Sequence, residues 1–134
     1  MKPTIIALAA FAAALAGPAA AQDQTAPQTA PMSIEDSLIC AGLFYVHSTL
    51  PENASFAEGV ETYRSITATF LTRAEILAGR EGKPTDGHVE RAAEVADMLL
   101  GQVNAAPDAS ARYAVIASWN ELEDACIAGG QQPA

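Results

Sequence analysis

The sequence predicts an all-α protein, an up-down-up-down four-helix bundle closed by one disulfide bond. Apolar residues recur at helical spacing, proline and glycine separate four such segments, and two cysteines lie near the two ends of the helical region. We divide the 134 residues into four parts. They are a signal peptide at 1–21, a flexible leader at 22–32, a helical bundle domain at 33–130 and a tail at 131–134.

The amino-terminal segment has the parts of an export signal. Lys2 precedes an apolar run over 4–16, and Ala19-Ala20-Ala21 follows a Gly-Pro pair as a small-residue cleavage site. The alternative is an uncleaved membrane anchor, but this run is shorter than the roughly 20 residues that span a bilayer. We expect cleavage after Ala21 and a periplasmic or secreted protein without stable membrane insertion.

The mature chain is strongly acidic. The sequence has 7 Lys plus Arg and 16 Asp plus Glu, and only Lys2 of these lies in the signal peptide, which leaves 6 against 16 and a formal net charge of −10. Binding to phosphates needs clustered cations, so nucleic acid is excluded as a partner and anionic membrane surfaces repel the protein. The charge favours a basic protein surface in the cell envelope as the partner.

The first two helices are predicted over about 34–50 and 54–78. Ser33 is the expected N-cap of the first, and the nearly continuous apolar stretch in its middle predicts a helix surrounded by protein. The second begins at a Ser-Phe-Ala-Glu sequence that matches a capping box at Ser55, with Asn53 as a competing cap. Its apolar residues then recur at steps of four and three, which predicts a packed seam.

The third helix is predicted over about 85–104, with small residues on one face that allow a neighbouring helix to approach closely. The fourth runs from its expected cap at Asp108 to the stop at Gly129-Gly130. Connections of roughly three to seven residues favour antiparallel neighbours, and hence the up-down-up-down order.

Cys40 and Cys126 are expected to form the disulfide bond. In the predicted topology the start of the first helix lies beside the end of the fourth, and an oxidising compartment favours the bond. A metal site or redox centre would need closer spacing than 86 positions. The bond would close a loop of about 87 residues, which the chain-entropy model values at roughly 4 to 5 kcal/mol.

No motif predicts catalysis, a metal site or a cofactor. The haem-attachment sequence C-x-x-C-H, the di-metal sequence Glu-x-x-His and the nucleophile sequence G-x-S-x-G are all absent. His47 and His88 fall at opposite ends of the predicted bundle, so they cannot share a metal, and each is expected at a surface or boundary position. We therefore predict a protein that is not an enzyme.

Antiparallel packing would gather acidic side chains at the end of the bundle near the cysteines. The expected members of this acidic pole are Glu35, Asp36, Glu81, Asp86, Glu121, Glu123 and Asp124. Arg80 and Lys83 are the nearby cations, so the pole would suit a basic partner surface or a divalent cation, with solvation by water and salt as the simpler interpretation. Glu90, Glu94 and Asp97 form a separate stripe that is interpreted as solvated surface.

Aromatic side chains near the connection between the first and second predicted helices give a second candidate site, an apolar pocket for a small ligand. Its expected members are Phe44, Tyr45, Phe56 and Tyr63, for which core packing is the simpler interpretation. No sequence feature identifies a specific function. We expect a non-enzymatic protein-interaction module, with a small-ligand or cofactor-binding bundle as the alternative.

Overall fold

The computed structural model describes residues 30–134, so the predicted signal peptide and residues 22–29 of the predicted leader lie outside the described residues. All regular elements within this range are helical. They are α2 (Ile34–Thr49), the short 3-10 helix η1 (Pro51–Asn53), α3 (Ala57–Glu81), α4 (His88–Asn104), α5 (Ala109–Ala117) and α6 (Asn120–Gly130). The prediction of an all-α protein is confirmed for this part of the chain. A search of the same residues finds no helix with the length and apolar character needed to cross a membrane.

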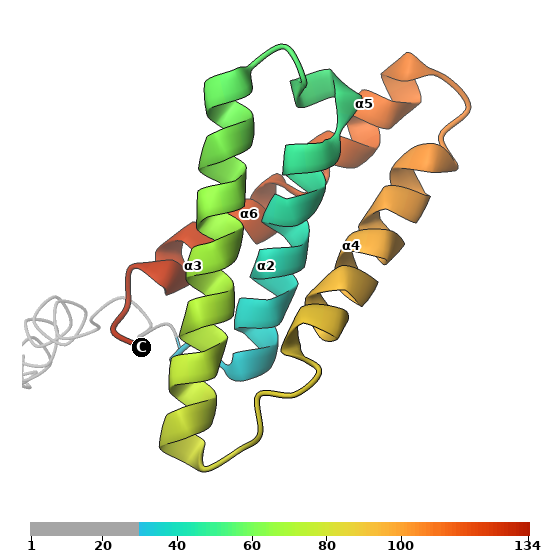
Figure 1. Cartoon of the computed structure of the whole chain (residues 1–134). Helices are drawn as coiled ribbons and strands as arrows, with labels where there is room; N and C mark the ends of the chain where they lie inside the picture. Colours follow the sequence, from blue (N-terminus) through green and yellow to red (C-terminus); the bar gives the residue numbers. More distant parts are fainter. Residues whose placement is uncertain (1–29) are drawn as a thin grey trace, which may run out of the picture. The chain divides into compact units, whose positions relative to one another are not determined.

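α2 lies at the centre of the unit formed by Pro31–Ala134 (Figure 1). α3 packs along one side of it, α4 along another, and α6 crosses it, whereas α3 and α4 scarcely touch each other. Ten of the sixteen residues of α2 are buried, among them Leu43 and Val46 at its middle. The prediction that this helix is surrounded by protein is therefore confirmed, and its apolar residues explain why it takes the central place.

The predicted up-down-up-down bundle, in which each helix packs on the next, is not confirmed. α3 does pack against α2 along much of its length, since the ring of Phe44 lies 6.2 Å from that of Tyr63 and 5.9 Å from that of Phe70. α4, however, packs on α2 rather than on α3. The approach is close at Gly42, where a Cβ atom would lie only 2.6 Å from the carbonyl oxygen of Ala92. The absence of a side chain at Gly42 thus allows α4 to lie close against α2.

The single fourth helix predicted by the sequence is two helices in the structure. α5 ends at Ala117 and α6 begins at Asn120, and at the break the backbone N–H of Trp119 donates to the carbonyl oxygen of Ile116, three residues back instead of four. The hydroxyl of Ser118 also donates to the carbonyl oxygen of Val115, a local bond that competes with helical ones. The break lets the indole of Trp119 turn inward, where it is buried. The predicted cap of this segment is confirmed, since the Asp108 carboxylate accepts a hydrogen bond from the backbone N–H of Ala111.

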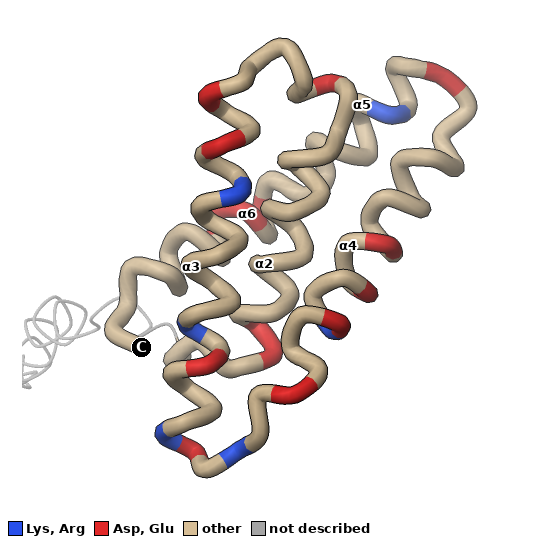
Figure 2. Tube along the Cα trace, viewed as in Figure 1, with Lys and Arg blue, Asp and Glu red and all other residues tan. Residues whose placement is uncertain are grey.

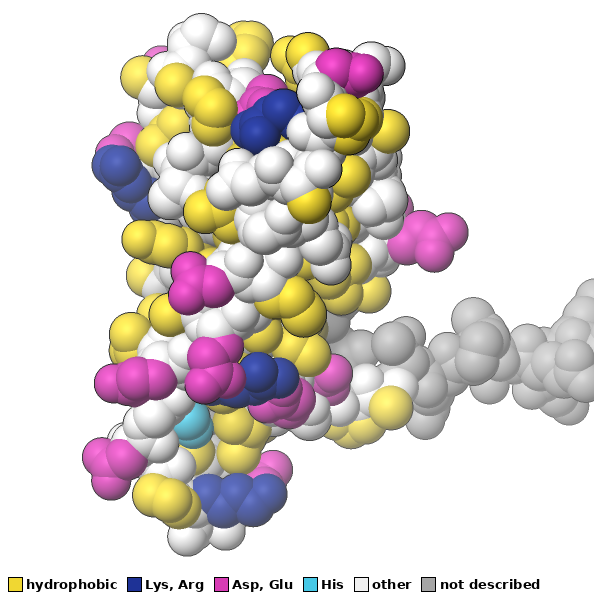
Figure 3. Space-filling view, turned by 90° about the vertical axis from the view of Figure 1, so that its right-hand side faces the viewer, with side chains coloured by type: hydrophobic (Ala, Val, Ile, Leu, Met, Phe, Trp, Pro, Cys, Tyr) yellow, Lys and Arg dark blue, Asp and Glu magenta, His cyan; other side chains and the backbone are white. Residues whose placement is uncertain are grey.

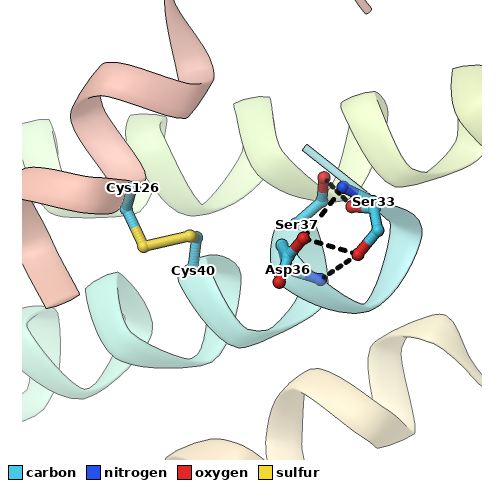
Figure 4. The surroundings of a disulfide bond; sticks show 5 residues. All are labelled: Ser33, Asp36, Ser37, Cys40 and Cys126. Carbon is cyan, nitrogen blue, oxygen red and sulfur yellow. Dashed lines mark hydrogen bonds between the residues drawn. A yellow bond between two sulfur atoms is a disulfide. The ribbon is translucent and has the colours of Figure 1, made fainter. Parts of the chain in front are cut away.

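Of the caps predicted for the first two helices, the cap of α2 is confirmed and the cap of α3 is wrong. Ser33 caps α2 in a full capping box, with its hydroxyl accepting from the N–H of Asp36 and the Asp36 carboxylate accepting from the N–H of Ser33 (Figure 4). These hydrogen bonds lower the pKa of Asp36 below its ordinary value. The prediction of a cap at Ser55 or Asn53 is wrong, because residues 51–53 form η1 and Phe56 occupies the N-cap position of α3.

The disulfide bond between Cys40 and Cys126 is confirmed and joins α2 to α6, with 5.6 Å between the two Cα atoms (Figure 4). One turn further along α6, Gly129 lies against Met32, so that a Cβ atom there would meet the end of the methionine side chain. Met32 is buried, although the sequence placed it in the leader. The amino end of the domain is thus packed under α6 beside the disulfide.

Candidate functional site

Several residues of the predicted acidic pole lie at the end of the unit where α2 begins and α3 ends. Glu35 accepts from the guanidinium of Arg91 at 2.6 Å, and Glu81 pairs with Lys83 at 2.6 Å. Glu35, Glu81 and Lys83 line one pocket of about 400 Å³. Asp36 is engaged in the capping box of α2. The carboxylates at this end are therefore largely paired, and the salt bridge raises the pKa of Arg91.

The structure does not bring all seven carboxylates together. Glu123 lies apart, because it contacts His47, while Cys126 of the following turn contacts Cys40. Cys40 and His47 are seven positions apart on α2, which is roughly 10 Å along a helix. Asp86 is exposed before α4, and Glu121 and Asp124 are exposed on α6. Within residues 30–134 no group of three or more His, Cys, Asp or Glu side chains is placed to hold a metal ion.

The acidic stripe on α4 forms an exposed surface. Glu90, Glu94 and Asp97 are all exposed, on the side of α4 opposite the buried residues that face α2. Figure 2 shows acidic positions following one another along α4, and Figure 3, which views this side, shows acidic side chains gathered beside hydrophobic ones. Val89 and Met98 are 64% and 58% exposed on the two margins of the stripe. The outer face of α4 therefore combines negative charge with exposed apolar area.

The four aromatic residues of the predicted apolar pocket are divided by the structure. Phe56 and Tyr63 line a pocket of about 530 Å³ at the start of α3, together with Asn53. Phe44 is instead buried in the core against Tyr63, and Tyr45 is 51% exposed and does not line that pocket. Two of the four residues thus lie at one pocket, and only Phe44 belongs to the core.

A buried histidine beside this pocket was missed by the sequence analysis. His47 is only 4% exposed, so its expected place at a surface or boundary is wrong. Its ring stacks on Tyr63 at 5.1 Å and meets the edge of Trp119 at 5.6 Å. Its Nε2 lies 2.7 Å from Oε1 of Glu123, and Asn53 donates to its carbonyl oxygen at 2.9 Å. His47 is thus buried between aromatic rings and paired with the partly exposed carboxylate of Glu123.

The position of Glu123 in the sequence contained a signal for this pair. It lies four residues after Trp119 and three before Cys126, both of which are buried, so all three residues share one helical face. An acidic side chain on such a face requires a hydrogen-bonding partner. His47 is the matching polar residue in the apolar stretch of α2, but only the crossing of α6 over α2 determines that the two meet.

His88 lies at the other end of α2 from His47. It is partly buried at the start of α4 and lines the pocket that contains Glu35 and Glu81. Its Nδ1 is buried and has no hydrogen-bond partner among the described residues. The two histidines therefore lie in separate environments.

Comparison with known proteins gives no family for this chain. No protein-family model matches it, and neither a curated protein nor a solved structure shows significant similarity. Function has to be inferred from the surfaces and pockets of the molecule itself.

Proposed function

We propose that the protein is an exported, non-enzymatic interaction module that binds a basic protein surface in the cell envelope through the outer face of α4. The observation that carries this proposal is the exposed stripe of Glu90, Glu94 and Asp97, with Val89 and Met98 on its margins. Charges of one sign orient a complementary partner surface, and the exposed apolar side chains beside them add contact area. Methionine adds a flexible apolar side chain that adapts to a partner.

The charges around the stripe support a basic partner. Arg91 donates to Glu35 at 2.6 Å and to Glu94 at 3.1 Å. This one cation of α4 offsets a single negative charge, and the acidic residues around it leave the outer face negative. A net charge of −9 for the whole sequence adds a long-range field of the same sign. Such a field speeds the encounter with a positive surface and repels acidic ones.

Export and topology are parts of the same proposal. The sequence of residues 1–21 and a disulfide that suits an oxidising compartment support export. We also infer that successive helices alternate in direction, up and down. They do not form the square of a regular four-helix bundle, because α2 lies at the centre and α3, α4 and α6 pack around it. In that arrangement α4 has one face against α2 and the opposite face available to a partner.

Site-specific crosslinking from Met98 would test the proposal. A photoreactive amino acid at Met98, in the protein as exported in its native envelope, is expected to capture a partner with a basic surface, whereas the same group at Thr62 on α3 is not. Thr62 is a suitable control because it is also exposed but lies on another helix. Capture of the same proteins from both positions would contradict the proposal.

Charge reversal then tests the chemistry with the purified partner. The triple change Glu90→Lys, Glu94→Lys and Asp97→Lys is expected to abolish binding, and added salt to weaken binding of the unchanged protein, since screening acts on exposed charges. Changing Glu58, Glu61 and Glu75 of α3 to lysine alters the net charge equally and is expected to leave most of the affinity. Equal losses in the two variants would leave only a general charge effect and exclude the α4 face.

A small-ligand site is the second candidate, and the pocket at the start of α3 favours it. Phe56 and Tyr63 offer aromatic surface there, and Asn53 offers an amide next to the buried ring of His47. A fluorescent probe with aromatic rings that bind apolar surfaces, such as anilinonaphthalene sulfonate, is expected to bind there. Phe56→Ala is expected to weaken its binding more than Tyr113→Ala, which removes another exposed ring. Equal effects of the two changes would exclude this pocket.

A further inference from the structure

Arg73 of α3 is an unusual buried cation. It is only 8% exposed, and arginine is seldom buried to this degree without an ionic partner. One terminal nitrogen donates to the carbonyl oxygen of Gln132 at 2.7 Å and the other to that of Pro133 at 3.1 Å. Its Nε is buried and has no hydrogen-bond partner among the described residues.

The groups that Arg73 contacts are uncharged. No carboxylate of residues 30–134 forms a salt bridge with Arg73. The partly buried Arg112, by contrast, pairs with the carboxylate of Glu52. Removing a guanidinium from water is costly unless an anion compensates it. The two carbonyl oxygens satisfy only part of its hydrogen-bonding capacity, since a guanidinium has five N–H donors.

A pocket lies directly beside this cation. Arg73 lines a space of about 430 Å³ between α3 and the carboxyl-terminal segment, with Phe70 and Ile76 as apolar walls and Thr69 and Thr72 as hydroxyl groups. This volume is within the range of small-molecule sites, which are largely apolar with a few polar groups that fix orientation.

We propose that this pocket binds a small organic carboxylate, with the carboxylate on the guanidinium of Arg73 and the apolar part of the ligand against Phe70 and Ile76. The carboxylate replaces the carbonyl oxygens of Gln132 and Pro133, so the segment 131–134 moves aside when the ligand binds. Replacement is favourable because a bidentate carboxylate forms charge-assisted bonds that are stronger than those of neutral carbonyls. The site is independent of the proposed partner surface, which lies on α4.

The test uses the full-length, disulfide-bonded protein and hexanoate as the probe. Calorimetric titration is expected to detect binding of hexanoate but not of hexanamide, which has the same chain without the charge. Arg73→Gln is expected to weaken the binding by roughly tenfold or more, because it removes hydrogen bonds to a charged group. Arg80→Gln removes an exposed cation from the same helix and is expected to leave the affinity unchanged.

A variant that lacks residues 131–134 keeps Arg73 and tests the site even if Arg73→Gln impairs folding. Hexanoate is expected to bind this shortened protein several-fold more tightly, because no carbonyl group competes for the guanidinium. The proposal would be overturned if hexanoate bound neither the full-length protein nor the shortened one. Equal binding to the Arg73→Gln variant would also overturn it, and inorganic phosphate that binds as tightly as hexanoate would overturn the assignment to an organic carboxylate.

Discussion

Ten of the sixteen residues of α2 are buried, whereas none of the nine residues of α5 is, although both helices are rich in apolar residues. The difference follows from their neighbours. α2 is contacted by α3, α4 and α6, and α5 packs mainly against the end of α4. Burial of an apolar helix is thus determined by how many other elements surround it, and composition alone does not decide it.

The two helices are also held by different interactions. α2 depends on apolar packing and on the disulfide to α6. α5 is held by a polar contact, in which Arg112 donates to Glu52 of η1 at 2.7 Å and lies 3.4 Å from the carbonyl oxygen of Val103. Changes to α2 should therefore lower the stability of the whole domain, and changes to α5 should have small effects.

Removal of the disulfide should give the largest effect. We expect the double change Cys40→Ala and Cys126→Ala to lower the free energy of unfolding by about 4 kcal/mol, because the unfolded chain loses a constraint on a long loop. Urea unfolding followed by circular dichroism measures this difference. Wild-type protein in strong reductant should behave in the same way, and an unchanged unfolding curve in both experiments would show that the bond contributes little.

A core truncation compares the two helices directly. Leu43→Ala in α2 should cost roughly 3 kcal/mol, since Leu43 is fully buried and a cavity would remain. Ile116→Ala in α5 should cost about 1 kcal/mol, because its side chain is only partly buried and loses less apolar contact. Thermal unfolding of the two variants measures the contrast, and equal losses would show that α5 belongs to the same cooperative core.

Two glycines sharpen the distinction between a packed and an open position. Gly42→Ala should destabilise by about 1 to 3 kcal/mol, because the new methyl group would overlap the backbone of α4 at Ala92 and the side chain of Val95. Gly101→Ala on the exposed side of α4 should instead stabilise by up to about 1 kcal/mol, since nothing lies within 4 Å and alanine favours the helix. Opposite signs are the expected result of denaturant titration, and a stabilising Gly42→Ala would refute the close packing of α2 and α4.

The smallest expected effect concerns the polar contact of α5. The hydrogen bond from Arg112 lowers the pKa of Glu52, so the unfolded state takes up a proton more readily than the folded state as the pH falls. The pair therefore contributes its full stability above the ordinary pKa of a glutamate carboxyl and loses it as the pH falls through the lowered value. Glu52→Gln should flatten this acid dependence in unfolding measurements between neutral and acidic pH. The exposed Glu58→Gln serves as control, and identical pH profiles of the two variants would argue against the contact.

Features that depend on a few neighbouring residues were predictable from the sequence. The Ser33 capping box, the Asp108 cap and the burial of α2 all follow from local hydrogen bonding and apolar spacing. The disulfide was predictable because only two cysteines are present and both are near the ends of the helical region. The cap of α3 was not predictable in this way, because two competing polar residues, Asn53 and Ser55, lie in one turn and Asn53 instead forms a contact with α2.

The sequence by itself determined that the described chain is helical, that its first helix is central and that its two cysteines can pair. Only the tertiary structure decided that α6 crosses α2, and this crossing places Glu123 on His47, away from the carboxylates at the start of α2. It likewise decided that the tail covers Arg73. The physical reason is that hydrogen bonds and periodicity act over a few residues, whereas the angle between two helices depends on the packing of side chains from distant segments.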